Sequence, residues 1–220
     1  MPRSLLPATA AFALSALALC PAARADCSSE VVDAVAKQSQ QKSYRMDSNV
    51  ISEQGPLKMT VEYLLPDRMR QVAVLAIDPA KPIETILVGN KAWSNTGEGW
   101  QPVADEDVEI LTSQLKMAAS SSPESIGEFD CIGVETIDGH SQRGYRGKPP
   151  KMKGLKNKDG TEQQSAARND AVRIVYIDTV SGLPARSIFA KVDQIDTPIF
   201  KEVYSYPPDI KIEAPKDVKP

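Results

Sequence analysis

The chain has 220 residues, of which 26 are Lys or Arg, 29 are Asp or Glu, and 41% are hydrophobic. This length suits one domain with a sizeable core. The slight acidic excess argues against nucleic acid as a general partner, because the phosphate backbone binds to basic surfaces.

Residues 1–25 have the pattern of a secretory signal peptide. Arg3 supplies the short basic start, residues 5–19 form an apolar core, and residues 23–25 (Ala-Arg-Ala) place small side chains where a signal peptidase reads them. The apolar core is too short and too close to this site to be a membrane-spanning helix. We therefore predict cleavage after Ala25 and export to the periplasm.

Lipidation of Cys20 is the alternative, but that chemistry favours a small residue before the cysteine, where this chain has Leu19. Loss of the leader removes two arginines and no acid, so the formal charge changes from −3 to about −5. Residues 26–220 are predicted to form a single domain.

Two cysteines, Cys27 and Cys131, remain after cleavage, and in an oxidising compartment they are expected to pair. The bond would close a loop of about 105 residues, which the chain-entropy model values at about 4–5 kcal/mol. A redox or metal site is the alternative. It lacks a C-x-x-C motif, and His140 is the only histidine.

The first half of the mature chain reads as a helix followed by strands. Ser28 and Ser29 are expected to cap an amphipathic helix that runs to about residue 42. Strands are then predicted at residues 44–51, 57–65, 68–77, 84–88, 91–94 and 100–102, with Gly and Pro turns between them.

The second half repeats this order. Acidic residues 105–107 open a helix whose Val108, Leu111 and Leu115 recur at helical spacing, and which ends in the serine run 120–122. Strands follow at residues 131–137, 141–146, 171–178, 185–192, 200–206 and 210–212. Roughly ten short strands with two helices and no βαβ rhythm predict an α+β fold, a curled antiparallel sheet that forms an incomplete barrel.

Several strand and turn signatures follow one another in a recognisable order. In the first half they are Pro66-Asp67-Arg68-Met69-Arg70 and the hairpin 88–93, which is followed by Trp100. In the second half they are the segment 131–135 with Asp138-Gly139, Ile177-Asp178 with residues 182–186, and Tyr204-Ser205-Tyr206, which leads to residues 210–212. This order resembles the periplasmic lipoprotein-carrier superfamily, the LolA-like fold, over about residues 31–215.

The resemblance implies about eleven strands around an apolar cavity that helices on the concave side partly cover. The cavity candidates are Met59, Val61, Tyr63, Val72, Val74, Ile86 and Val88 from strands, and Val108, Leu111 and Leu115 from the helical lid. Alternatively, these side chains fill a solid core. The family also implies an interior arginine that holds the lid, for which Arg68, Arg70, Arg173 and Arg186 are equal candidates.

A basic segment begins the predicted loop 143–170. Seven charges fall within sixteen positions, interrupted by Gly and Pro: Arg143, Arg146, Lys148, Lys151, Lys153, Lys156 and Lys158. The segment could dock an acidic membrane protein or anionic lipid headgroups, or be a solvated insertion.

Catalytic signatures are missing from the sequence, which has no G-x-S-x-G, P-loop, dinucleotide fingerprint or H-E-x-x-H. We therefore predict a non-enzymatic monomer without cofactor or metal. Its expected role is to bind or carry a hydrophobic ligand (a lipid, an acyl chain or a lipoprotein anchor) in the half-barrel. The alternative is a periplasmic interaction or sensor module with a filled core.

Overall fold

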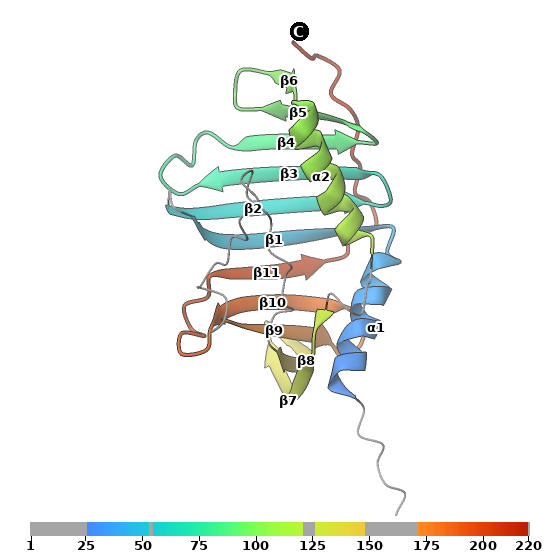
Figure 1. Ribbon diagram of the computed structural model, residues 1–220, viewed down its shortest axis with the longest axis vertical. Helices are drawn as coiled ribbons and strands as arrows, with labels where there is room; N and C mark the ends of the chain where they lie inside the picture. Colours follow the sequence, from blue (N-terminus) through green and yellow to red (C-terminus); the bar gives the residue numbers. More distant parts are fainter. Residues whose placement is uncertain (1–25, 53–54, 121–125, 148–170, 220) are drawn as a thin grey trace, which may run out of the picture.

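The computed structural model describes residues 26–52, 55–120, 126–147 and 171–219. Within these residues one sheet contains β1 (Ser43–Ser52), β2 (Gly55–Leu64), β3 (Arg68–Leu75), β4 (Ile83–Val88), β5 (Lys91–Asn95), β6 (Trp100–Pro102), β7 (Phe129–Ile137), β8 (His140–Gly147), β9 (Ala171–Asp178), β10 (Pro184–Lys191) and β11 (Phe200–Ser205). The order is β6-β5-β4-β3-β2-β1-β11-β10-β9-β8-β7, and every neighbouring pair is antiparallel (Figure 1).

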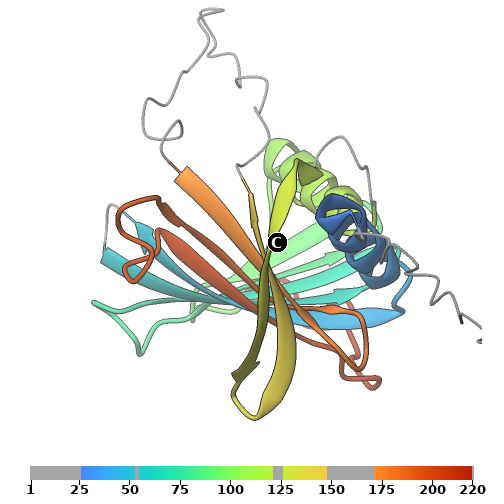
Figure 2. The same ribbon diagram turned by 90° about the horizontal axis from the view of Figure 1, so that it is seen from below.

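The sheet is strongly curved and both helices lie on its concave side (Figure 2). Helix α1 (Cys27–Ser39) lies beside the β7–β10 half, and α2 (Asp105–Ala118) crosses the β2–β5 half (Figure 1). The predicted α+β incomplete barrel is therefore confirmed. No described helix is long and apolar enough to span a membrane.

Helix α1 begins one residue before the predicted serines. Its N-cap is Asp26, whose carboxylate accepts from the Ser28 backbone N–H at 3.2 Å, while the Ser29 hydroxyl donates to the Asp26 carbonyl at 2.7 Å. An aspartate satisfies the free N–H groups of a first turn as well as a serine does. The helix buries Val31 and Ala34 and ends at Ser39, earlier than predicted.

Two separate hydrophobic clusters form on the concave face, one beneath each helix. The α1 cluster consists of Val31, Ala34, Ile126, Phe129, Tyr145, Val175 and Ile177. The α2 cluster consists of Tyr44, Val61, Tyr63, Met69, Leu87, Ala92 and Leu115, with Met59, Val108 and Leu111 packed against it. A third cluster, around Ile174 and Tyr176, lies on the opposite face of β9, because these residues alternate with Val175.

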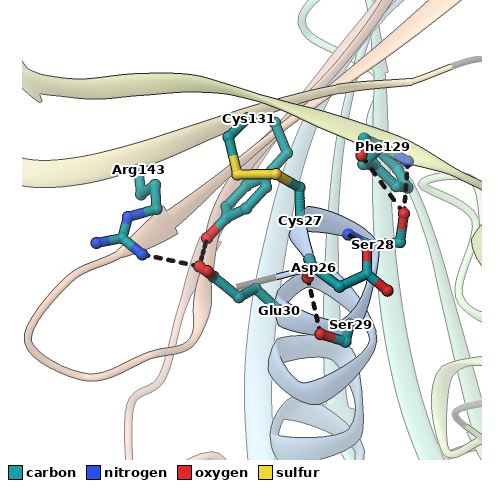
Figure 3. The surroundings of a disulfide bond; sticks show 9 residues. Asp26, Cys27, Ser28, Ser29, Glu30, Phe129, Cys131 and Arg143 are labelled. Atoms are coloured by element: carbon teal, nitrogen blue, oxygen red, sulfur yellow. Dashed lines mark hydrogen bonds and ion pairs between the residues drawn. A yellow bond between two sulfur atoms is a disulfide. The ribbon is translucent and has the colours of Figure 1, made fainter. Parts of the chain in front are cut away.

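The predicted disulfide is confirmed. Cys27, at the start of α1, is bonded to Cys131 in β7, with the two Cα atoms 5.4 Å apart (Figure 3). Immediately after Cys131 the β7–β8 register shifts by one residue, and Gly133 has a φ of 110°, which favours glycine. The bond thus ties α1 to the strand at one edge of the sheet.

The final predicted strand, residues 210–212, is not a strand. Ile212 is nevertheless buried, and its carbonyl accepts from the Arg68 guanidinium at 2.8 Å. The chain then continues to a single bridge between Val218 and Trp100. Burial of one apolar side chain thus accounts for the hydrophobic pattern that predicted a strand.

Candidate functional site

Six of the ten predicted cavity residues meet where α2 packs on the concave face, three from the sheet and three from the helix. Met59, Val61 and Tyr63 occupy alternate positions of β2, so their side chains share one side of the sheet. Val108, Leu111 and Leu115 face them from α2. Val61 is 0% exposed and Leu115 is 3% exposed, so this part of the face is closely packed.

The remaining four candidates lie on the opposite face, which corrects the predicted common lining. Met59 pairs with Ala73 and Val61 pairs with Gln71, so Val72 and Val74 point the other way. Ile86 pairs with Arg70, and Val88 with Arg68, on that same opposite face. Both faces of β3 carry apolar side chains, and only the register distinguishes them.

The opposite face of β1–β4 carries an ion-pair network. Glu62 accepts from Arg45 at 2.5 Å and from Arg70 at 3.3 Å, and Arg70 also donates to Glu84 at 2.6 Å. Arg70 is therefore held away from the concave side. Arg186 likewise pairs with Asp138 from the outer face.

Arg173 is the member of the four arginine candidates that lies on the concave face. It pairs with Phe189 in the register, and its Nε donates to the Ser187 hydroxyl at 3.3 Å. In the described parts of the chain no carboxylate lies within ion-pair distance of its guanidinium. The sequence alone left this choice open.

A polar row that the sequence analysis missed crosses the middle of the concave face. Ser48, Glu202 and Ser187 are consecutive register partners on β1, β11 and β10, and both serines are buried. The Tyr204 hydroxyl donates to Glu202 at 2.6 Å, and burial together with this carboxylate raises the pKa of Tyr204. The alternation in β11 could have predicted Glu202 as a member of this row, because it places Glu202 between Phe200 and Tyr204 on one face.

Two stacked tyrosines hold α2 to the sheet. The rings of Tyr44 and Tyr63 have centroids 4.6 Å apart. The Tyr44 hydroxyl donates to the Ala118 carbonyl at 3.5 Å, and the side chains of Tyr63 and Gln114 are hydrogen-bonded. Burial raises the pKa of both tyrosines, that of Tyr63 to about 12, so both hydroxyls stay protonated at neutral pH.

An open pocket of about 470 Å³ lies between the first half of α2 and the β4–β6 edge. It is lined by Thr85, Ser94, Thr96, Gln101, Pro102, Val103, Ala104, Asp107, Ile110 and Leu111. Leu111 belongs both to this pocket and to the α2 cluster. The pocket therefore adjoins the packed apolar strip that α2 covers.

The basic docking candidates are only partly described. Arg143 donates to Glu30 at 2.9 Å, beside the disulfide (Figure 3), so part of its charge is used within the fold. Arg146 lies on β8, opposite Asp130 and Ile174. Lys148, Lys151, Lys153, Lys156 and Lys158 lie outside the described residues. Within the described ranges, no group of three His, Cys, Asp or Glu side chains could hold a metal.

Comparison with known proteins establishes the fold. No family model and no curated protein sequence matches the chain. The crystal structure of the Mycobacterium tuberculosis lipoprotein LppX aligns over 85% of this chain and 98% of its own, with 14% identity and a TM-score of 0.57. LprF from Mycobacterium bovis aligns over 87% and 97%, with 12% identity and a TM-score of 0.53. At these identities the likeness shows the fold alone: the chain has the same fold as LppX and LprF.

Proposed function

We propose that the mature chain is a non-enzymatic carrier or binding protein for a hydrophobic ligand, held on the concave face beneath α2. The observation that carries this proposal is the way α2 covers an apolar strip of β1–β5. Leu115 is the one buried side chain of the helix, and Leu111, one turn earlier, lines the 470 Å³ pocket. The volume of this pocket lies within the range of about 300–1,000 Å³ that is typical of small-molecule sites.

Helix α2 acts as the lid in this proposal. Elements with few buried contacts open locally at low free-energy cost. When α2 lifts, the side chains of Met59, Val61 and Tyr63 become available to an acyl chain, which replaces the contacts of Leu111 and Leu115. The likeness to LppX and LprF supports a curved sheet with this helix arrangement.

Export is part of the proposal. The Cys27–Cys131 bond suits an oxidising compartment, which agrees with a signal peptide at residues 1–25. Cleavage after Ala25 would leave Asp26, the N-cap of α1, as the first residue of a single periplasmic domain that acts as a monomer.

An interaction module with a filled interior is the second candidate, and the complete burial of Val61 and Leu87 favours it. In that case the protein would act through surfaces such as the basic segment 143–158, on an acidic membrane protein or on anionic headgroups. The two candidates differ in whether a hydrophobic ligand enters the space beneath α2.

Two tryptophan variants test the carrier proposal with the neutral fluorophore N-phenylnaphthylamine. Met59→Trp adds bulk among the packed side chains beneath α2, whereas Val72→Trp adds the same bulk on the opposite face. We expect fluorophore affinity to fall about tenfold or more in Met59→Trp and to stay at the wild-type value in Val72→Trp. Wild-type affinity in both variants would refute the site, and no binding to the wild type would favour the interaction module.

A further inference from the structure

A second pocket, of about 370 Å³, lies at the end of the sheet where the last residues of β1 and the first residues of β2 meet the β3–β4 and β10–β11 connections. These ends are on the left in Figure 1, while α1 and α2 lie toward the right. Eight of its eleven lining residues are apolar: Val50, Ile51, Pro56, Leu57, Val74, Ala76, Pro79 and Pro198. The other three are Asn49, Lys58 and Lys201.

The pocket opens on the face of the sheet opposite to α2. Lys201, Asn49, Lys58 and Val74 are consecutive register partners across β11, β1, β2 and β3. Lys58 precedes Met59, which packs beneath α2, so the two side chains point to opposite faces. The pocket is thus separate from the site proposed above.

Two positive charges face this apolar pocket without a negative partner in the described residues. Lys58 and Lys201 flank Asn49 on the two neighbouring strands, about 10 Å apart at their Cα atoms. Neither forms an ion pair within the described ranges. Both ammonium groups are positive, so an anion that lies between them would be stabilised by both charges.

The apolar character continues beyond the pocket wall. Ile51 is 64% exposed and lines the pocket, and Ile77 is 74% exposed and follows the lining residue Ala76. These side chains extend the apolar surface at the pocket mouth. A ligand with a hydrocarbon chain would therefore bury more apolar area here than the enclosed volume alone provides.

We propose that this pocket is a second binding site, specific for a single-chain anionic amphiphile. The hydrocarbon chain of this ligand lies between Ile51, Val74 and Pro198, and its anionic headgroup, such as a carboxylate, lies between Lys58 and Lys201. The volume is at the lower end of the range of about 300–1,000 Å³ for small-molecule sites, which fits one chain. This inference does not depend on binding beneath α2.

Isothermal titration calorimetry with dodecanoate below its micelle concentration tests the chemistry. Dodecanol has the same chain without the charge, and acetate has the charge without the chain. We expect dodecanoate to bind at this pocket at least roughly tenfold more tightly than dodecanol, and acetate not to bind. Equal affinity for dodecanoate and dodecanol would overturn the proposal. Binding only to phosphatidylglycerol vesicles would also overturn it, in favour of a membrane-contact surface.

The variant Lys58→Met/Lys201→Met keeps the aliphatic length of both side chains and removes their charges. It should lose roughly tenfold in dodecanoate affinity at this site with dodecanol unchanged, while Lys91→Met, an exposed lysine on β5, should match the wild type. Val74→Trp should remove the site by filling it. Wild-type dodecanoate binding in both pocket variants would overturn the proposal.

Met59→Trp separates this inference from the proposed function. If Met59→Trp abolishes all binding of dodecanoate, the second site does not exist and the concave site remains. If Val74→Trp abolishes all binding and Met59→Trp none, the second site stands and the concave site fails.

Discussion

Tyr44 and Tyr63 stack across β1 and β2 with ring centroids 4.6 Å apart, directly beneath α2. Each side chain also makes a hydrogen bond to that helix, Tyr44 to the Ala118 carbonyl and Tyr63 to Gln114. The same pair of rings therefore forms the floor of the proposed site and fastens its lid. Opening of the lid must break both hydrogen bonds.

Tyr63→Phe removes one of these hydrogen bonds and keeps the ring. We expect amide hydrogens of α2 to exchange about two- to tenfold faster, because one net hydrogen bond of about 0.5–1.5 kcal/mol is lost on the closed side of the equilibrium. Tyr176→Phe, on the opposite face, should leave α2 exchange unchanged. Unchanged exchange in Tyr63→Phe would show that Tyr63 does not hold the lid.

Cys27→Ser/Cys131→Ser opens the covalent loop and leaves no free thiol in the mature chain. The two cysteines are 104 residues apart, so the free energy of unfolding should fall by about 4 kcal/mol in urea titrations. Binding of N-phenylnaphthylamine should persist, because the disulfide lies at α1 and β7 and the proposed site lies beneath α2. Equal unfolding midpoints of the oxidised wild type and this variant would contradict the first expectation.

Glu30 makes the free energy of unfolding depend on pH. The Tyr145 hydroxyl donates to its carboxylate, and Arg143 pairs with it, so the pKa of Glu30 is lowered in the folded state from its ordinary value of 4.5. The ionised form is thus favoured by folding. Its contribution to stability is complete above the unfolded pKa and is lost as the pH falls through the folded pKa.

Glu30→Gln should therefore be less stable than the wild type at pH 7, with the difference shrinking as the pH falls below 4.5. Urea unfolding across this range measures the difference. Glu109→Gln, an exposed glutamate on α2, is the matched control. A difference that stays constant with pH would indicate lost packing and not a lost charge.

Gly144 allows β8 to lie against the irregular end of β7. An alanine Cβ there would lie 2.8 Å from Ile132 Cγ1 and 3.1 Å from Tyr176 Cε1. Gly144→Ala should lower the unfolding free energy by about 1–3 kcal/mol. Because Ile132→Ala removes the nearer contact, the double variant should recover part of that loss in a double-mutant cycle. Strict additivity would contradict the clash.

Sequence periodicity predicted those site residues whose element has one apolar face. In β2, Met59, Val61 and Tyr63 alternate with polar residues, and in α2 the spacing of Val108, Leu111 and Leu115 defines one face, so their common cluster was predictable. Strand β3 is apolar on both faces, so Val72 and Val74 could be placed only from the register with β2 and β4.

The polar row shows a second limit of the sequence. Its residues Ser187 and Glu202, together with the neighbouring Arg173, come from three strands that are adjacent only in the folded sheet. Alternation gives the face of each side chain within its own strand, but strand order decides which side chains become neighbours. Which of the four arginine candidates lies on the concave face therefore required the structure.

Native mass spectrometry of the mature protein, purified without detergent from its own cell envelope, tests the central claim most directly. We predict a polypeptide mass beginning at Asp26 that carries a noncovalent lipid or acyl ligand, and loss of that ligand in Met59→Trp but not in Val72→Trp. A bare polypeptide mass, with no later uptake of N-phenylnaphthylamine, would contradict the account. It would favour the second candidate, a protein that acts as an interaction module.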